Sequence, residues 1–103
     1  MNLSLSSAEF KHIIKTSKPL VFGDLSFKYL PRSQPALGMI VSRQYGNAVE
    51  RNRLKRRCRS LFKTVFVDEG AEIALIVRPK NQNLSFYLIK NSFMAIYDKI
   101  CDC

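Results

Sequence analysis

The sequence predicts an α/β (α+β) two-layer sandwich in which three helices pack on a small sheet. Apolar residues recur with the helical period of 3.6 in three segments. Elsewhere they alternate with polar residues or form a short, nearly uninterrupted apolar run, as they do in strands. The predicted order is helix, strands, helix, strand, helix, and this order favours helices layered on one sheet.

The first predicted helix covers residues 7–16. Ser6 and Glu9 stand three residues apart directly at its start, which is the spacing of a capping box. Three apolar side chains follow at helical spacing on one face, namely Phe10, Ile13 and Ile14. We therefore expect this helix to pack on the rest of the domain through that face.

Three strands are predicted. Apolar and polar residues alternate over residues 24–30, and residues 37–42 are rich in β-branched side chains. The prolines in 31–35 place a turn between these two strands. Residues 73–77 are nearly all apolar, which predicts a strand buried on both faces.

The second helix is predicted over residues 48–66 and the last over 84–100. Asn47 and Glu50 again have the spacing of a capping box. The apolar stripe of the second helix consists of Leu54, Cys58, Leu61, Phe62 and Val65. The last helix has a stripe of the same spacing.

Composition limits the function classes. The chain has 103 residues, enough for one domain over residues 1–103, and its formal net charge is +9. The excess of positive charge predicts an anionic partner. No apolar run reaches the roughly 18 residues of a membrane span, so we expect a cytoplasmic protein. The three cysteines and the single histidine, His12, lack the spacing of a zinc site.

The second helix carries the strongest functional signal. Six of the nine residues from Arg51 to Arg59 are cationic and none is acidic. Such a run is often a solvated face of a core-packed helix. Here the cations repel one another without acidic residues to relieve them, and arginine matches phosphate geometry, so the pattern favours a phosphate backbone as partner.

The same segment resembles the signature of the bacterial ribonuclease P protein family. The matching positions are Gly46, Asn47, Ala48, Val49, Arg51, Asn52, Arg53, Lys55, Arg56 and Arg59. Residues 37–43 resemble the strand before the signature, and Glu9-Phe10 with Ile13-Ile14 resemble the family's first helix. The resemblance extends over nearly the whole chain.

The resemblance implies a subunit of an endoribonuclease, ribonuclease P. The family partners one large catalytic RNA and removes the 5′ leader of precursor tRNA. The RNA and its bound Mg²⁺ carry the chemistry, so the protein alone is expected to be inactive, without catalytic residues or metal ligands of its own. The implied partners are the catalytic RNA, in an expected 1:1 complex, and precursor tRNA, with no DNA or membrane. The implied fold has a mostly antiparallel sheet of about four strands and a left-handed βαβ crossover.

Two sets of site residues follow from the motif and the resemblance. The expected contacts to the catalytic RNA are Arg43, Arg51, Asn52, Arg53, Lys55, Arg56, Arg59 and Lys63. The family holds the leader in a cleft between the first helix and the sheet, and the expected contacts there are Phe10, Lys11, Phe27, Lys28 and Tyr29. Aromatic rings beside cations suit sequence-tolerant binding of single strands. The alternative for Phe10 and Phe27 is that both belong to the core.

Three other functions fit parts of the pattern. A ribosomal or other structural RNA-binding protein would also be small and basic. A DNA-binding regulator would place the basic helix in the major groove, but the cations surround most of the helix and helix-turn-helix spacing is absent. A stand-alone hydrolase would need paired carboxylates, metal ligands or a nucleophile signature, none of which the sequence contains.

Overall fold

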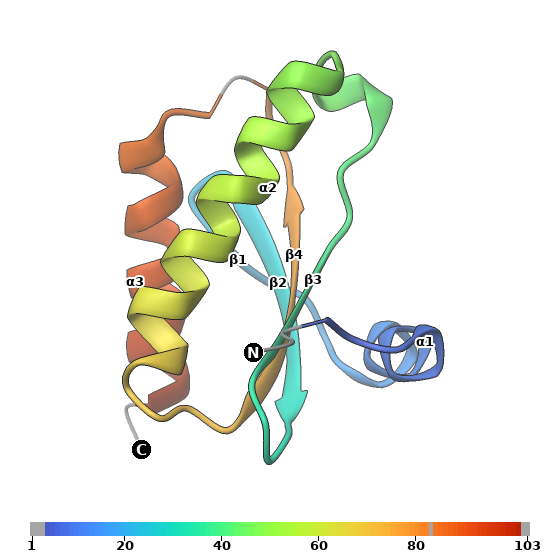
Figure 1. Ribbon diagram of the computed structural model, residues 1–103, viewed down its shortest axis with the longest axis vertical. Coiled ribbons are helices and arrows are strands. Elements are labelled where there is room, and N and C mark those ends of the chain that lie inside the picture. Colours follow the sequence, from blue (N-terminus) through green and yellow to red (C-terminus); the bar gives the residue numbers. More distant parts are fainter. Residues whose placement is uncertain (1–3, 83, 102–103) are drawn as a thin grey trace.

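The computed structural model describes residues 4–82 and 84–101, and for residue 101 the backbone alone. Figure 1 shows its three helices and its four-stranded sheet. The elements are α1 (Ser7–Thr16), β1 (Leu20–Phe22), β2 (Leu25–Pro31), β3 (Ala36–Met39), the 3₁₀ turn η1 (Arg43–Tyr45), α2 (Ala48–Phe62), the π-helical turn η2 (Lys63–Val67), β4 (Ile73–Pro79) and α3 (Phe86–Cys101).

The sheet has the strand order β1-β2-β4-β3. β2 is antiparallel to both β1 and β4, whereas β3 is parallel to β4. α2 connects the two parallel strands. In Figure 1, β3 and β4 both run upward, β3 lies nearer the viewer, and α2 lies to their left. This arrangement is the left-handed crossover that the family resemblance implies, and it is rare among βαβ units.

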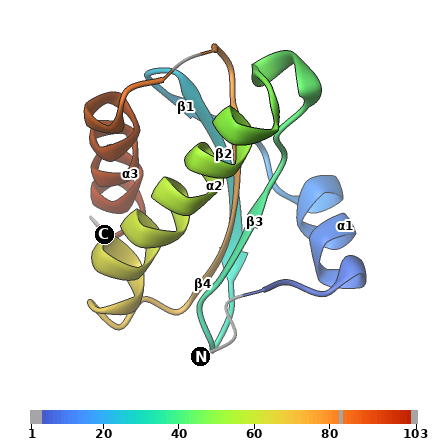
Figure 2. The same cartoon turned by 45° about the horizontal axis from the view of Figure 1, so that its top comes forward.

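The helices cover the two faces of the sheet unequally. α2 and α3 lie side by side on one face, and α1 lies alone on the other (Figures 1 and 2). The predicted α+β sandwich is confirmed, with sheet and paired helices as its two main layers. α1 covers part of the opposite face, and this partial cover positions the candidate site.

Alternation along the strands divides the core. Leu25 and Phe27 of β2 point to the side of α2 and α3, where most buried side chains gather. β4 is buried on both faces, as predicted, because Leu75 joins this main core while Ile76 joins a smaller core under α1.

Both predicted capping boxes are present. The Ser6 hydroxyl accepts a hydrogen bond from the backbone N–H of Glu9 (3.2 Å), and the Asn47 side chain accepts one from Glu50 (2.9 Å). Each glutamate accepts the N–H of its cap residue in return. α1 therefore has the predicted bounds, and α2 begins where the sequence places it.

The structure differs from the sequence prediction most clearly at β1, at the end of β3 and at the end of α2, while β2, β4 and α3 differ from their predicted bounds by one or two residues. β1 was not predicted, because its three residues are too few to show a period; Gly23, at φ +60°, forms the tight turn into β2. β3 ends at Met39 rather than at residue 42. The predicted helix over 48–66 is α-helical only to Phe62, and its last turn widens to π-helix before Gly70 (φ +73°) ends the segment.

Candidate nucleic-acid interface

α2 presents its cations to solvent because its apolar stripe is fully used by the core. Leu54, Cys58, Leu61 and Phe62 are buried against the sheet and α3. Burial also raises the pKa of the Cys58 thiol to about 12, so this thiol stays neutral and serves as a small apolar group. The remaining faces of α2 carry the signature residues.

The signature residues lie where the helical period places them. Asn52, Arg53, Arg56 and Arg59 are exposed, as is Arg43 on η1, whereas Arg51 and Lys55 are half-buried. Lys63 is also exposed, and it alone among these residues forms an ion pair in the described part of the chain, with Asp68 at 3.3 Å. The positive charge of α2 is thus largely uncompensated at its N-terminal end.

Arg51 differs from its neighbours on α2. Its Nε is buried, and it is the one buried side-chain nitrogen or oxygen in residues 4–82 and 84–101 without a hydrogen-bond partner. A buried guanidinium N–H without an acceptor costs free energy, so this side chain is held in place at some cost to stability.

A groove of about 660 Å³ lies on the opposite face of the sheet, beside α1. We call it the sheet groove; its lining includes Ile14, Val21, Ser26, Lys28, Ile76 and Arg78. At one end, Gln82 donates a hydrogen bond to the Gln44 carbonyl (2.5 Å) and so ties the loop after β4 to η1. An apolar floor with cations at its sides suits an unpaired nucleic-acid strand.

Strand register places the cations of the sheet groove. Ser26 pairs with Arg78 and Lys28 pairs with Ile76 across β2 and β4, so these side chains share the face toward α1. The Lys28 Nζ donates a hydrogen bond to the Ile14 carbonyl at the end of α1 (2.9 Å). Lys28 thereby helps to hold α1 against the sheet while it lines the groove.

The predicted leader-binding set is divided by the sheet, and two of its members, Phe27 and Tyr29, lie away from the sheet groove. Phe27 is completely buried in the main core, where its ring meets that of Phe93 edge-on at 5.5 Å. Tyr29 is half-buried on the same side, packed against the main core. Both differ in strand parity from Lys28, so they lie on the face opposite the sheet groove.

The other members of that set lie on the side of α1. Phe10 is half-buried in the smaller core and lines a second hollow of about 270 Å³, together with Gly38 of β3 and with Lys55 and Arg59 of α2. Lys11 is exposed on α1. Of the five residues expected in the leader cleft, Lys28 alone lines the sheet groove.

Sequence reasoning missed Arg78 and Val21, which line the sheet groove. The signal for Arg78 was available: it follows the apolar run 73–77 on the same parity as Ala74 and Ile76. Without the pairing register, however, the sequence does not tell which parity faces α1.

No three His, Cys, Asp or Glu side chains of the described residues are grouped so that they could hold a metal ion. No helix in the described ranges is both long enough and apolar enough to cross a membrane.

The fold and these surfaces define a class of protein: a small α+β domain with a cationic helix on one face of a mixed sheet and an open groove on the other. Within this class, the chain belongs to the ribonuclease P protein family, since the family model described as Ribonuclease P matches residues 4–101. The function of this family is removal of the 5′ leader of precursor tRNA together with an RNA subunit.

Curated relatives agree with this assignment. The chain is 28% identical to the ribonuclease P protein component of Acholeplasma laidlawii, over 91% of this chain and 84% of that protein. It is 27% identical to that of Dictyoglomus turgidum, over 88% and 82%. The match to the Finegoldia magna protein, at 29% identity, spans 69% of this chain but 65% of the relative, and the match to the Thermus scotoductus protein spans 38% of that relative.

Solved structures show the same fold. The Staphylococcus aureus RNase P protein superposes with a TM-score of 0.81 at 23% identity, covering 98% of this chain and 97% of that one. The protein from Thermotoga maritima gives a TM-score of 0.76 at 22% identity, covering 93% and 96%.

Proposed function

We propose that this chain is the protein component of ribonuclease P, an endoribonuclease that assembles with a catalytic RNA and removes the 5′ leader of precursor tRNA. The observation that carries the proposal is α2, whose signature residues Arg53, Arg56 and Arg59 are exposed without a carboxylate partner in the described part of the chain. Family membership favours this role over that of a ribosomal or other structural RNA-binding protein.

The catalytic RNA binds along α2. Arginine side chains offer paired donors that match phosphate oxygens, and Asn52 can bond to a phosphate or a ribose hydroxyl. Because α2 is capped and packed on the core, these groups are held at fixed spacing before the RNA arrives. A rigid row of cations favours a folded RNA of matching shape, with an expected stoichiometry of 1:1.

The precursor leader enters the sheet groove. Lys28 and Arg78 attract its phosphates, and the apolar floor formed by residues such as Ile76 and Val21 accommodates its bases. Such contacts use no base edge, so they tolerate many leader sequences. Mature tRNA has no leader and leaves this groove unused.

The protein supplies no group for the cleavage step in this proposal. A cationic surface does not suit a divalent cation, and the described residues offer no carboxylate cluster to hold one. We place the Mg²⁺ ions on the RNA, where they would supply the Lewis-acid chemistry of cleavage. The chain neutralises phosphates and holds the substrate, which matters most when Mg²⁺ is scarce.

Cleavage of precursor tRNA at low Mg²⁺ tests the proposal. A bacterial ribonuclease P RNA should cut at the mature 5′ end much faster with this chain than without it, and the RNA-free chain should not cut. Absence of stimulation, or site-specific cleavage by the protein alone, would contradict the proposal.

Matched variants separate the two surfaces. Arg56→Ala should weaken binding to the catalytic RNA and lower the slope of log K against log salt by about 1. Lys99→Ala removes the same charge from the far end of α3 and should change neither quantity. In the assembled complex, Arg78→Ala should reduce affinity for precursor tRNA and leave affinity for mature tRNA unchanged.

A further inference from the structure

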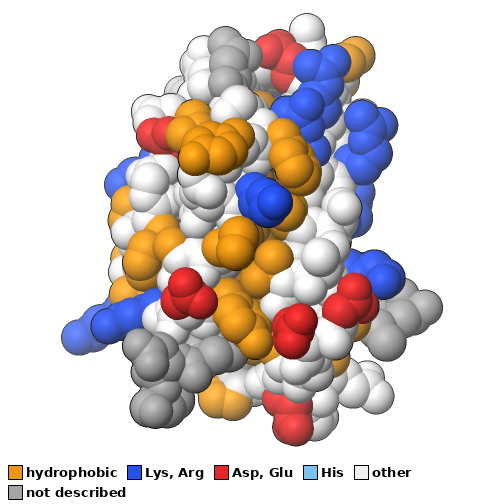
Figure 3. Space-filling model, turned by 90° about the vertical axis from the view of Figure 1, so that its left-hand side faces the viewer, with side chains coloured by type: hydrophobic (Ala, Val, Ile, Leu, Met, Phe, Trp, Pro, Cys, Tyr) orange, Lys and Arg blue, Asp and Glu red, His pale blue; other side chains and the backbone are white. Residues whose placement is uncertain are grey.

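The first two residues of α3, next to α2, are exposed aromatic residues. Phe86 is 43% exposed and Tyr87 is 70% exposed, whereas Ile89, Phe93 and Ile96 of the same helix are buried. Leu88 and Met94 of α3 are exposed as well. Figure 3 shows exposed hydrophobic side chains on this side of the molecule next to Lys and Arg side chains. Contiguous exposed apolar side chains rimmed by charged residues are typical of an interaction site.

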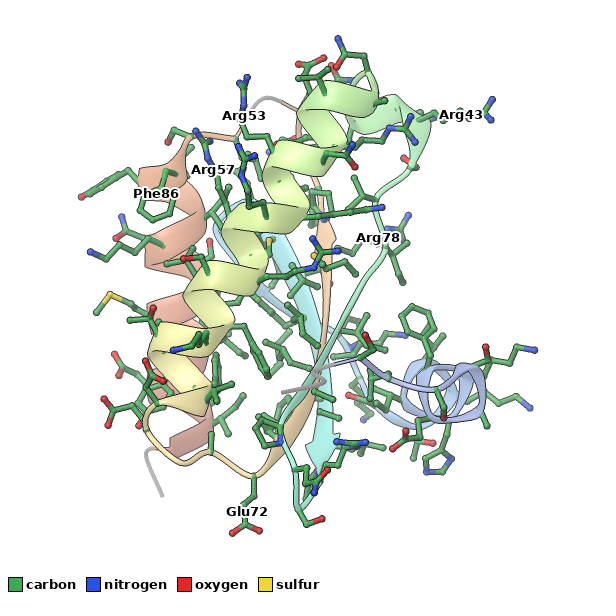
Figure 4. All side chains as sticks on the ribbon, in the orientation of Figure 1. Arg43, Arg53, Arg57, Glu72, Arg78 and Phe86 are labelled. Carbon is green, nitrogen blue, oxygen red and sulfur yellow. The ribbon has the colours of Figure 1, made fainter. Side chains whose placement is uncertain are left out.

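Arginines from α2 adjoin these rings. The Arg57 guanidinium carbon lies 6.0 Å from the centre of the Phe86 ring, at the range of a cation–π contact. Figure 4 shows Arg53, one turn earlier on α2, projecting on the same side. We call Arg53, Arg57, Phe86 and Tyr87 the α2–α3 platform.

The two arginines of the platform have no ion-pair partner in the described part of the chain. Neither Arg53 nor Arg57 has a carboxylate within ion-pair distance in residues 4–82 and 84–101. The first turn of α3 contains no acidic residue, and the labelled Glu72 lies at the opposite end of the molecule (Figure 4). Aromatic rings beside the two arginines favour an anionic partner that also has flat faces.

We propose that the α2–α3 platform binds an unpaired segment of the catalytic RNA, with one base stacked on Tyr87 or Phe86 and the adjoining phosphates held by Arg53 and Arg57. Each unpaired nucleotide offers both a base face that can stack on an aromatic ring and a phosphate that can bind an arginine. The inference rests on the proposed function, because it takes the catalytic RNA to be the ligand of α2.

Continuity with α2 selects the catalytic RNA over the precursor. Arg53 and Arg57 belong to the same helix as Arg56 and Arg59, so an RNA that follows α2 reaches the platform without leaving the surface. The sheet groove lies on the other face of the sheet, behind the main core. A leader bound there is separated from the platform by the sheet and by α2 and α3.

Tyr87→Ala tests the platform. Because the side chain is largely exposed, the variant should fold normally, which circular dichroism can verify. Its affinity for a bacterial ribonuclease P RNA should fall at least about 5-fold, the lower limit expected for one lost stacking contact. Tyr87→Phe keeps the ring and should bind as the wild type does. Leu88→Ala is the matched control, since Leu88 is an exposed apolar residue (43%) of the same helix without an aromatic face.

The outcomes distinguish this inference from the proposed function. If the wild-type chain stimulates cleavage while Tyr87→Ala binds the RNA normally, the platform is wrong and the proposed function stands. If the wild-type chain fails to bind the RNA, the proposed function and the inference about the platform are both wrong. Equal losses of RNA affinity in Tyr87→Ala and Leu88→Ala would show that the surface makes a general apolar contact and would overturn the inferred base stacking. A change confined to precursor affinity, or to self-association measured by sedimentation, would assign the surface to the leader or to a second copy and overturn the inference.

Discussion

At the scale of single residues, Glu9 links a helix start to a distant loop. Its carboxylate accepts a hydrogen bond from the Arg32 Nε (2.8 Å) and another from the Ser6 backbone N–H (3.3 Å). The Arg32 hydrogen bond is the main reason why the pKa of Glu9 is lowered to about 2, and the bonds with Ser6 add to it. α1 is thereby attached to the segment between β2 and β3.

Arg32→Ala should raise the pKa of Glu9 toward its ordinary value of 4.5. A carboxyl with a lowered pKa in the folded state stabilises the protein above about pH 4.5, and this stabilisation is lost as the pH falls toward 2. The variant should therefore be less stable than the wild type above about pH 4.5, and this difference should narrow as the pH falls toward 2, because the variant has less Glu9-linked stability to lose.

Titration of the Glu9 side chain by NMR measures this directly. Arg32→Lys is the control that keeps the charge but loses the Nε geometry, and it should give an intermediate pKa. Identical Glu9 titrations in the wild type and in Arg32→Ala would show that the pair does not form in solution.

At the scale of elements, the start of α2 depends on its cap. Asn47→Ala removes the acceptor for the Glu50 N–H and should lower the free energy of unfolding by about 1 kcal/mol. Asn52→Ala, on the exposed face of the same helix, should leave stability unchanged and weaken RNA binding instead. Urea unfolding of both variants checks the contrast, and equal loss of stability in the two would contradict the capping role.

Gly38 sets how closely α1 approaches β3. A Cβ at this position would lie 2.8 Å from the Phe10 ring and 3.2 Å from a Leu5 methyl carbon. Gly38→Ala should therefore destabilise the protein by about 1–3 kcal/mol through overpacking. The loss should be smaller in a Phe10→Leu background, because the shorter side chain leaves room; additive losses in a double-mutant cycle would show that the two residues do not interact.

Periodicity and capping patterns predicted the elements that are long or that carry strong end signals. The bounds of α1 follow from Ser6 and Glu9, and the burial of β4 on both faces follows from its apolar run. β1 escaped prediction because three residues cannot show a period. The π-helical turn after α2 was also not predicted, because its residues keep the apolar spacing that an α-helix would have.

The candidate site was predictable where it lies on one helix and not where it depends on two elements. The exposure of Arg56 and Arg59 follows from the stripe of α2 alone. Placing Tyr29 required knowing which face of β2 meets α1, and that depends on long-range pairing. The platform at Phe86 and Tyr87 could not be predicted either, because it depends on the packing of α3 beside α2, which brings Arg57 next to Phe86.

At the scale of the whole molecule, the sheet separates two binding surfaces. Arg56 lies on α2 and Arg78 lines the sheet groove on the opposite face, so we expect the two side chains to contact different RNA segments. In the assembled enzyme the effects of Arg56→Ala and Arg78→Ala should multiply, since substitutions at independent sites have additive free energies. Affinities for catalytic RNA and precursor tRNA across the two single variants and the double variant test this, and a double variant no worse than either single one would indicate one shared site.

The pairing of β2 with β4 has a further consequence. If β2 slipped by a single residue against its partner, Phe27 would point to water and Lys28 would point into the main core. The same error would thus bury a charge, expose an aromatic ring and remove a cation from the groove in one event. A misaligned chain could not persist as a stable but inactive competitor for RNA, because the alternation that gives the groove its chemistry also excludes the wrong alignment.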